Sequence, residues 1–203
     1  MQDWMKIFHF NRALLRGHFK LSSGLHSPVY IQCARILMYP WYAEELGQAL
    51  SQKIRAHALP EMIVSPALGG MIIGHETARA LSLPFLFTER YGGNMMLRRG
   101  FEIAKDTAVW IVEDVVTTGK SSLETAEVIR QYGGQVIGFA ALVDRRTNGG
   151  TFPAPFVSLL EIPAPVYKPN ACPLCKEKIP ITTPGSRFSS GSAAPPQPPS
   201  ADA

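Results

Sequence analysis

The chain has 203 residues, of which 46% are hydrophobic, and its 20 Lys and Arg against 16 Asp and Glu give a formal net charge of +4. No basic run indicates a nucleic-acid partner, no apolar stretch approaches the ~20 residues of a membrane helix, and the N-terminus lacks the pattern of a secretory signal. Three cysteines are too few and too odd in number for a disulfide framework, so we expect a cytoplasmic protein.

The N-terminal part of the chain predicts a helix and then two strands. Asp3 can cap a helix whose apolar positions continue to Leu15, with Gly17 ending the pattern. Two short strands are predicted around the turn Ser22-Ser23-Gly24, with Cys33 in the second. Residues 43–58 then follow the amphipathic period of a helix.

From residue 62 onward, short apolar strands alternate with helices. Strands are predicted at 62–65, 85–88, 108–112, 135–143 and 156–160, and helices at 71–81 and 120–132. This alternation indicates an α/β fold with a central, mostly parallel sheet flanked by helices on both faces. In such folds ligands bind beyond the carboxyl ends of the strands, which directs attention to the loops that follow them.

The last part of the chain has a different composition. Residues 185–203 consist mainly of Ser, Ala and Pro and cannot bury enough apolar surface to fold, so they predict a disordered tail. Its two proline pairs leave docking to a polyproline-binding partner open, although a passive tail is the simpler interpretation.

The segment VWIVEDVVTTGKSS, residues 109–122, joins a predicted strand to a predicted helix and admits three interpretations. A nucleoside-triphosphate-binding P-loop would need a glycine at position 114, where Asp114 would repel a triphosphate. An ordinary turn with Thr118 as helix cap leaves the two adjacent acids unexplained. In the third interpretation, the N–H groups of residues 117–121 hold a phosphate while Glu113 and Asp114 accept hydrogen bonds from the attached sugar.

The third pattern resembles the loop that binds phosphoribosyl pyrophosphate (PRPP) in the type I phosphoribosyltransferases. That resemblance implies a PRPP-binding set that includes every residue of the loop. Its members are Glu113, Asp114, Val115, Val116, Thr117, Thr118, Gly119, Lys120 and Ser121.

Four further segments resemble those of orotate phosphoribosyltransferases, and the resemblance covers residues 16–184. They are GHFKLSSGLHSPVYIQ at 17–32, SPALGG at 65–70, TER at 88–90 with LRRGF at 97–101, and VDR at 143–145. The family fold that this implies is a small hood at about 1–40 on a core at 41–184, followed by the tail.

The implied reaction is transfer of the phosphoribosyl group from PRPP to orotate in de novo pyrimidine (UMP) biosynthesis, giving orotidine 5′-monophosphate and pyrophosphate. The resemblance assigns residues of this chain to three roles, which are catalysis, PRPP binding and orotate binding. Glu113, Asp114 and Arg90 would be catalytic; Arg90, Leu68 and Gly69 would also bind PRPP; and Thr117, Arg145, Tyr30 and Ile31 would bind orotate. The resemblance also implies Mg²⁺, held mainly through PRPP, and a homodimer with a shared active site.

In this hypothesis, arginines supply the positive charge that the anionic substrates require. Orotate has a carboxylate, which Arg145 at a strand end can bind through two hydrogen bonds, although a bridge to Asp144 is the alternative. Residues 90–100, with Gly92 and Gly93, are interpreted as a lid that excludes water, or alternatively as an exposed basic hairpin.

Two departures from the family pattern keep other functions open. Ser22 and Gly69 stand where many orotate enzymes have lysines, and backbone N–H groups at 68–70 are a plausible substitute for the second. The alternatives are a transferase for another nucleobase and a regulator with the same fold that senses PRPP or a nucleotide and binds nucleic acid.

The pair Cys172 and Cys175 raises the question of a metal site. One C-x-x-C supplies two of the four ligands of structural zinc, and no histidine nearby in sequence has ligand spacing. We therefore expect no metal site and interpret the pair as reduced thiols in a proline turn, with His26 as a turn histidine; a four-thiolate site across a dimer axis is the alternative.

Overall fold

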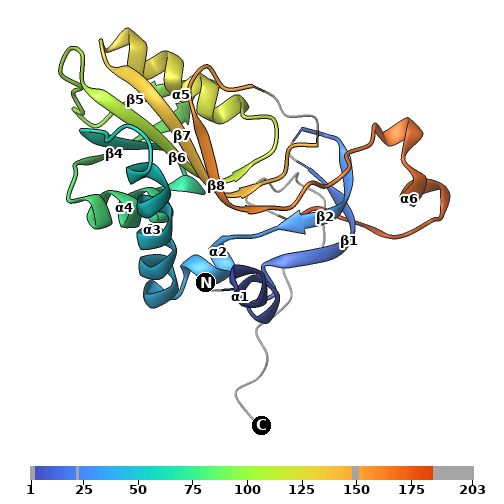
Figure 1. Cartoon of the computed structure of the whole chain (residues 1–203). Helices are drawn as coiled ribbons and strands as arrows, with labels where there is room; N and C mark the ends of the chain where they lie inside the picture. Colours follow the sequence, from blue (N-terminus) through green and yellow to red (C-terminus); the bar gives the residue numbers. More distant parts are fainter. Residues whose placement is uncertain (1–2, 22, 148–150, 185–203) are drawn as a thin grey trace. The chain divides into compact units, whose positions relative to one another are not determined.

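The computed structural model describes residues 3–21, 23–147 and 151–184 and divides into two compact units (Figure 1). The larger unit comprises Met1–Leu15 and Ile31–Pro165, and the smaller comprises Arg16–Tyr30 and Val166–Ala203. The tail predicted at 185–203 lies outside the described residues.

The larger unit is built on a six-stranded sheet in the order β5-β4-β3-β6-β7-β8. All neighbours are parallel except β5, which runs antiparallel to β4. The strands are β3 (Met62–Pro66), β4 (Phe85–Tyr91), β5 (Asn94–Leu97), β6 (Ala108–Val116), β7 (Gln135–Asp144) and β8 (Phe156–Glu161). The sequence predicted all of these except β5, and the α/β fold with a mostly parallel sheet is confirmed.

Five helices belong to this unit: α1 (Trp4–Phe10), α2 (Ala34–Leu37), α3 (Pro40–Arg55), α4 (Gly70–Leu81) and α5 (Lys120–Gln131). The expectation that the first helix continues toward Leu15 is wrong, because the chain turns at Arg12, where φ is 50°, and Leu15 lies in a strand. The strand predicted at Cys33 is also wrong, since this buried residue immediately precedes α2. In the described part of the chain, no helix combines the length and apolar character needed to cross a bilayer.

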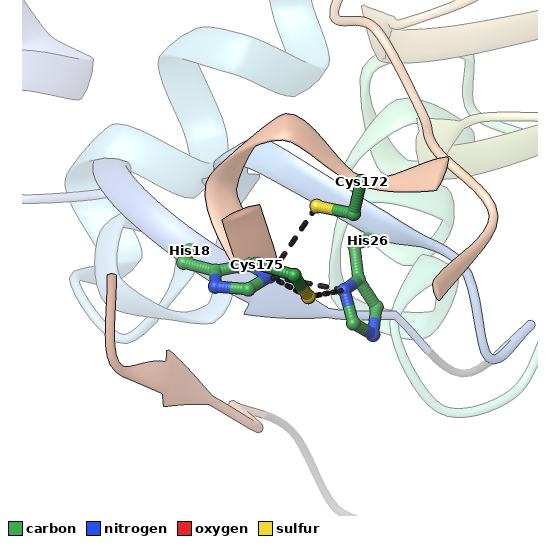
Figure 2. Close-up of side chains that lie close together, drawn as sticks. All are labelled: His18, His26, Cys172 and Cys175. Carbon is green, nitrogen blue, oxygen red and sulfur yellow. Dashed lines mark hydrogen bonds between the residues drawn. The ribbon is translucent and has the colours of Figure 1, made fainter. Parts of the chain in front are cut away.

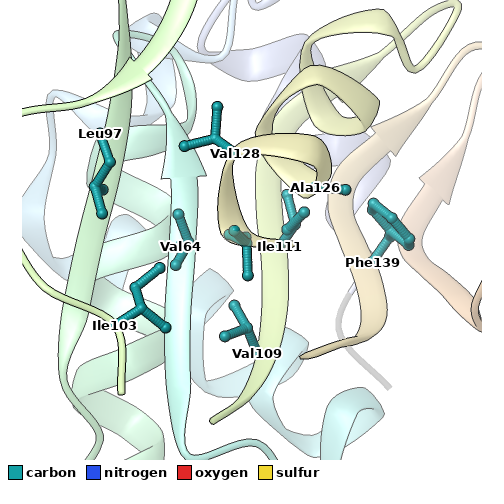
Figure 3. Packing of buried hydrophobic residues seen from close by; sticks show 9 residues of the cluster. Val64, Leu97, Ile103, Val109, Ile111, Ala126, Val128 and Phe139 are labelled. Carbon is teal, nitrogen blue, oxygen red and sulfur yellow. The ribbon is translucent and has the colours of Figure 1, made fainter. Parts of the chain in front are cut away.

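Helix α5 covers one face of the sheet and builds a hydrophobic core against it (Figure 3). Ala126, Val128 and Ile129 of α5 pack over Val64 of β3 and Ile111 of β6. Every second residue of a strand points to the same face, so the intervening residues are available to the other layer. The central strands, which include β6 and β7, are therefore nearly continuous apolar runs, and packing on both faces fixes their position.

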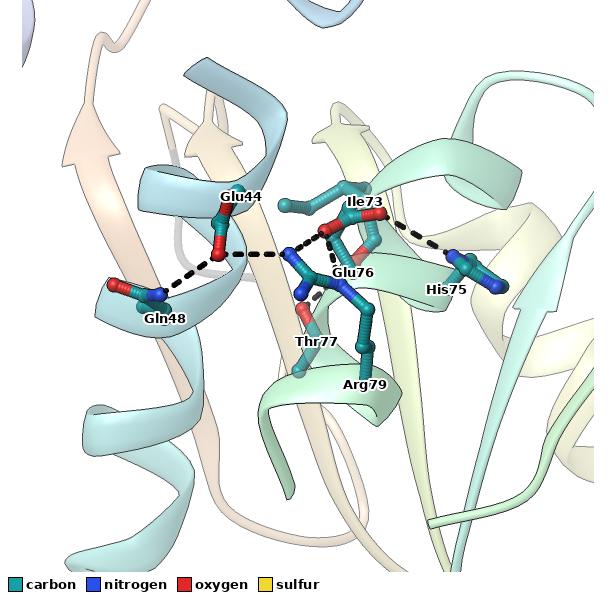
Figure 4. Close-up of polar contacts among 7 residues, drawn as sticks. All are labelled: Glu44, Gln48, Ile73, His75, Glu76, Thr77 and Arg79. Carbon is teal, nitrogen blue, oxygen red and sulfur yellow. Dashed lines mark hydrogen bonds and ion pairs between the residues drawn. The ribbon is translucent and has the colours of Figure 1, made fainter. Parts of the chain in front are cut away.

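Helices α3 and α4 pack together on the other side of the sheet. Gly47 allows close approach, because a side chain there would meet the backbone of Glu76 at 2.7 Å. Figure 4 shows that Arg79 of α4 bridges Glu76, at 2.7 Å, and Glu44 of α3, at 3.2 Å. The exposed ion pairs add little stability, so the close packing holds the two helices together.

The smaller unit contains a three-stranded sheet in the order β2-β1-β9 and a C-terminal segment with two short helices. Its elements are η1 (Pro169–Ala171), α6 (Pro173–Lys176), β9 (Ile181–Thr182) and most of β1 (Leu14–Lys20) and β2 (His26–Ile31), whose outer ends, Leu14, Leu15 and Ile31, belong to the larger unit. At the predicted turn the N–H of Gly24 donates to the carbonyl of Leu21 at 2.9 Å, while Ser22 lies outside the described residues. His26 begins β2 and pairs with Tyr167, which corrects its interpretation as a turn histidine.

Candidate active site

The acid pair lies within strand β6, which extends four residues further than predicted, to Val116. Pairing with β7 continues along this extension, with Glu113 opposite Ala141 and Val116 opposite Asp144. The sequence pattern ends the strand at Val112 because the next two residues are charged. The hydrogen-bonded ladder overrides that local preference and gives both carboxylates a fixed backbone.

The Glu113 carboxylate faces helix α5. It accepts a hydrogen bond of 2.5 Å from the hydroxyl of Ser122, which is buried. Burial raises the pKa of Glu113 to about 8, and the charge of Asp114 adds to the effect, while the Ser122 hydrogen bond opposes it. A carboxyl with this pKa is largely protonated near neutral pH.

Asp114 faces the segment before α4, as expected from the alternation of side chains along a strand. A side chain on Gly69 would meet the Asp114 carboxylate at 2.6 Å, and one on Gly70 would meet the carbonyl oxygen of Val112 at 2.9 Å. Burial raises the pKa of Asp114, against the effect of the backbone N–H groups of Val115 and Asp114 itself. Only glycine at 69 leaves the space beside this carboxylate free.

The segment before α4, which contains the predicted PRPP-binding residues Leu68 and Gly69, thus lies beside Asp114. It is attached to the sheet by the N–H of Ala67, which donates to the carbonyl of Thr88 at 2.7 Å. The peptide bond between Ala67 and Leu68 is cis, and the side chain of Leu68 is 76% exposed. This residue can therefore offer backbone groups to a ligand without its side chain interfering.

The predicted phosphate loop leads directly from β6 into α5. Thr117 and Thr118 are exposed, and Gly119 adopts the left-handed conformation, with φ at 74°, at the helix cap position. The cap is therefore Gly119 and not Thr118, the residue that the ordinary-turn interpretation would require, although the Thr118 hydroxyl accepts a hydrogen bond of 3.3 Å from the N–H of Lys120. The first N–H groups of a helix carry a partial positive charge and have no intrahelical acceptor, so this end of α5 can bind an anion.

Arg145 follows β7 directly, and its backbone N–H donates to the carbonyl of Val116 at 2.8 Å. Its side chain is only 5% exposed. Arg146, which the sequence analysis did not single out, makes a two-point contact with Asp144 at 2.8 and 2.9 Å. Burial opposes ionisation of Asp144, but these contacts outweigh it and lower its pKa. The bidentate acid–arginine pair at this strand end is therefore formed by Arg146 with Asp144.

The basic segment 90–100 is a hairpin in which β5 returns along β4. Arg90 donates to the carbonyl of Gly93 at 2.9 Å and forms an ion pair with Glu124 of α5. Arg99 pairs with Glu89 at 3.1 Å. The structure therefore shows these arginines engaged with acids of the same unit.

Two predicted orotate-binding residues lie on β2. Ile31, at the end of the strand, is buried, and Tyr30 belongs to the smaller unit, where its ring packs against Phe19 with a centroid distance of 5.7 Å. The acids, the phosphate loop, the 68–69 segment and Arg145 all belong to the larger unit.

Sequence reasoning missed Ser122, whose hydroxyl is the partner of Glu113, and the buried hydroxyl pair of Thr88 and Thr125 at 2.7 Å. The signal for Ser122 was its position in the first turn of α5, on the side that faces the sheet. A buried hydroxyl there needs a polar partner, and Glu113 supplies it.

Comparison with known proteins agrees with this geometry. The family model described as the phosphoribosyl transferase domain matches residues 36–170. The orotate phosphoribosyltransferase of Carboxydothermus hydrogenoformans is 47% identical over 91% of this chain and 97% of its own length. That of Thermotoga maritima is 45% identical over 86% of this chain and 93% of its own.

Solved structures give the same result for the fold. The crystal structure of orotate phosphoribosyltransferase from Aeropyrum pernix is similar with a TM-score of 0.66 and 28% identity, over 79% of this chain and 94% of that one. Adenine phosphoribosyltransferase from Thermoanaerobacter pseudethanolicus shares the fold, with a TM-score of 0.55 and 16% identity over 66% of this chain and 88% of that one. The acid pair at the strand end, the helix that follows it and these relatives agree: the chain belongs to the phosphoribosyltransferase family, among the orotate phosphoribosyltransferases.

Proposed function

We propose that this chain transfers the 5-phosphoribosyl group of PRPP to orotate, releasing pyrophosphate and forming orotidine 5′-monophosphate for UMP synthesis. One observation most strongly supports the assignment of the sugar to the acid pair and of the base to Arg145. The strand that carries Glu113 and Asp114 pairs in register with the strand that precedes Arg145, with Val116 opposite Asp144. Groups suited to a sugar and a group suited to an anionic base therefore end at the same edge of one sheet.

The 5-phosphate would bind at the beginning of α5. The N–H groups of residues 117–121 and the hydroxyls of Thr117, Thr118 and Ser121 supply donors, and the positive end of the helix dipole favours a dianion. Lys120 carries an exposed cation on the same turn. Val115 and Val116, which the family pattern also includes, contribute backbone in the strand that leads into this turn.

The acids would recognise the ribose. Their carboxylates accept hydrogen bonds from its 2′- and 3′-hydroxyls, and their negative charge stabilises the positive charge that develops at the anomeric carbon. In the reaction the bond from that carbon to a pyrophosphate oxygen breaks, the bond to a ring nitrogen of orotate forms, and the proton of that nitrogen passes to the released pyrophosphate or to water. Burial keeps Glu113 largely protonated without substrate, so binding of the hydroxylated sugar and loss of this proton are coupled.

The pyrophosphate and its cation would lie beside Gly69. The missing side chain at Gly69 leaves space against the Asp114 carboxylate, where backbone donors of Leu68 and Gly69 can meet an anion. These few protein donors fit a Mg²⁺ ion held mainly by substrate oxygens. When bound, Mg²⁺ neutralises the leaving pyrophosphate.

Orotate would be held at the end of β7. Arg145 is buried, so a charge-assisted pair with the orotate carboxylate would be shielded from water there. Thr117 is proposed to contact the base through its hydroxyl, and Tyr30 and Ile31 to cover it. Arg90 would leave Glu124 to meet the phosphates when the 90–100 hairpin closes, in a homodimer whose subunits share the site. The hood at about 1–40, the core at 41–184 and a cytoplasmic location remain predictions.

The test is a base-competition assay with PRPP and Mg²⁺. We expect pyrophosphate release and nucleotide formation with orotate, and none with adenine, guanine, hypoxanthine or xanthine. Turnover with a purine but not with orotate would contradict the assignment of the base. Binding of PRPP without turnover on any base, together with salt-dependent binding to RNA or DNA, would identify a regulator instead.

A further inference from the structure

The smaller unit contains a cluster of four side chains of the types that bind metals, and none of the four has a role in the proposed function. The cluster consists of His18 on β1, His26 at the start of β2, and Cys172 and Cys175 on either side of the first residues of α6 (Figure 2). Within the described residues this is the one group of three or more His, Cys, Asp or Glu with ligand atoms close enough to share an ion, and those atoms lie within 4.8 Å of one another.

The distances within the cluster match a tetrahedral zinc site. Zinc bonds of ~2.3 Å to sulfur and ~2.05 Å to nitrogen place tetrahedral ligand atoms about 3.3 Å apart for two nitrogens and about 3.6 Å apart for nitrogen and sulfur. Nε2 of His18 lies 3.0 Å from Nδ1 of His26, 3.6 Å from the sulfur of Cys172 and 3.7 Å from that of Cys175. Nδ1 of His26 lies 3.4 Å from the Cys175 sulfur. Small movements would bring all four atoms into contact with one ion.

A second contact orients His18 as metal-binding histidines are usually oriented. Its Nδ1 lies 2.8 Å from the carbonyl oxygen of Ile179. A carbonyl can only accept, so Nδ1 carries the proton and Nε2 presents its lone pair to the cluster. The partner carbonyl belongs to the same C-terminal segment as the two cysteines, so that segment both supplies ligands and orients one from β1.

The burial of these side chains has little other explanation. His18, His26 and Cys172 are at most 6% exposed, while Cys175 lies at the surface. In the described part of the smaller unit, the other buried hydrophobic side chain is Phe19. A unit with so small an apolar core gains stability from a structural metal more readily than from burying two imidazoles.

We propose that His18, His26, Cys172 and Cys175 bind one Zn²⁺ ion per chain. Four protein ligands leave no position for substrate or water, so the site is structural. The two thiolates balance the charge of the ion, and the ion ties the C-terminal segment to strands β1 and β2. The site replaces the four-thiolate arrangement across a dimer axis, because one chain provides all four ligands.

Metal analysis of the full-length protein without a histidine tag tests this directly. We expect about one zinc per chain after dialysis against metal-free buffer, and protection of Cys172 and Cys175 from alkylation until a chelator is added. Replacement by Co²⁺ should give the visible bands of tetrahedral cobalt with a sulfur-to-cobalt charge-transfer band. Negligible zinc after growth and refolding with zinc, together with cobalt spectra typical of octahedral coordination, would overturn the proposal, as would a Cys172–Cys175 disulfide found by mass spectrometry in the freshly isolated protein.

Variants separate the four ligands from other thiols and imidazoles. Cys172→Ser and His18→Gln should each reduce zinc affinity by at least tenfold, whereas Cys33→Ala and His9→Ala, at positions outside the cluster, should retain full zinc content. If a ligand variant does not fold, the zinc content and cobalt spectrum of the unaltered chain still decide the question. These readouts do not depend on orotate turnover, so the metal site and the proposed function can fail separately.

Discussion

Glu113→Gln should change how stability depends on pH. Burial moves the pKa of Glu113 from 4.5 to about 8, so between these values the folded protein keeps a proton that the unfolded chain has released. Its stability therefore falls as pH rises through this range, and the isosteric, uncharged glutamine removes that loss. From pH 5.5 to pH 8 the full pKa shift would lower the free energy of unfolding by about 3 kcal/mol. Partial solvent access to the carboxyl reduces our expectation for this loss to about 2 kcal/mol.

Urea or thermal unfolding without substrate, from pH 5.5 to 8.5, measures this effect. Relative to the unaltered protein, Glu113→Gln should gain about 2 kcal/mol across the range, or about 4–8 °C in Tm for a chain of this size. Glu102→Gln, which removes an exposed carboxylate, is the matched control and should not reproduce this gain. A Glu113→Gln difference that stays constant from pH 5.5 to 8.5 would refute the assignment of a buried, protonated carboxyl.

Three further predictions concern the substrates. Asp114→Asn should keep the fold and reduce kcat/KM for PRPP by about 10- to 100-fold in steady-state assays, because a charged hydrogen-bond acceptor for the sugar is lost. Arg145→Ala should raise KM for orotate by about 10- to 100-fold and leave PRPP affinity, measured by calorimetry, nearly unchanged; loss of PRPP binding would contradict its assignment to the base. Gly69→Ala should weaken PRPP binding in the same calorimetric assay, because its side chain would lie 2.6 Å from the Asp114 carboxylate, whereas Leu68→Ala should retain binding because Leu68 contributes only backbone groups.

Much of the fold could be predicted because its signals are local. The apolar runs of β3, β6 and β7 and the amphipathic period of α3 and α5 are visible in short windows of sequence. The misses have physical causes. Strand β6 continues through Glu113 and Asp114 because β7 pairs with it, and the first helix ends early because the chain turns at Arg12. Strand β5 was missed because its four residues are too few for a recognisable apolar run and its position depends on pairing with β4 across the turn at Gly92 and Gly93.

The candidate site was predictable where one short segment carries it. The order of acids, hydroxyls, glycine and lysine at 113–121 is chemically specific, and the structure places it at a strand end and helix start. The His–Cys cluster could not be predicted in this way, because His18 and Cys172 are 154 residues apart. Ligand spacing within one motif detects only metal sites built from neighbouring residues, and here the fold brings the two halves together.

The pairing of β6 with β7 has a consequence for how specificity can change in this fold. The residues proposed to bind the sugar and the base lie at the ends of adjacent strands about 4.8 Å apart, so in the proposed function the sheet fixes their separation independently of either set of side chains. Residues after β7 could then be exchanged for ones that suit a different nucleobase while the strand proposed to bind the sugar stays intact. A shared scaffold that handles both pyrimidine and purine acceptors follows from that independence.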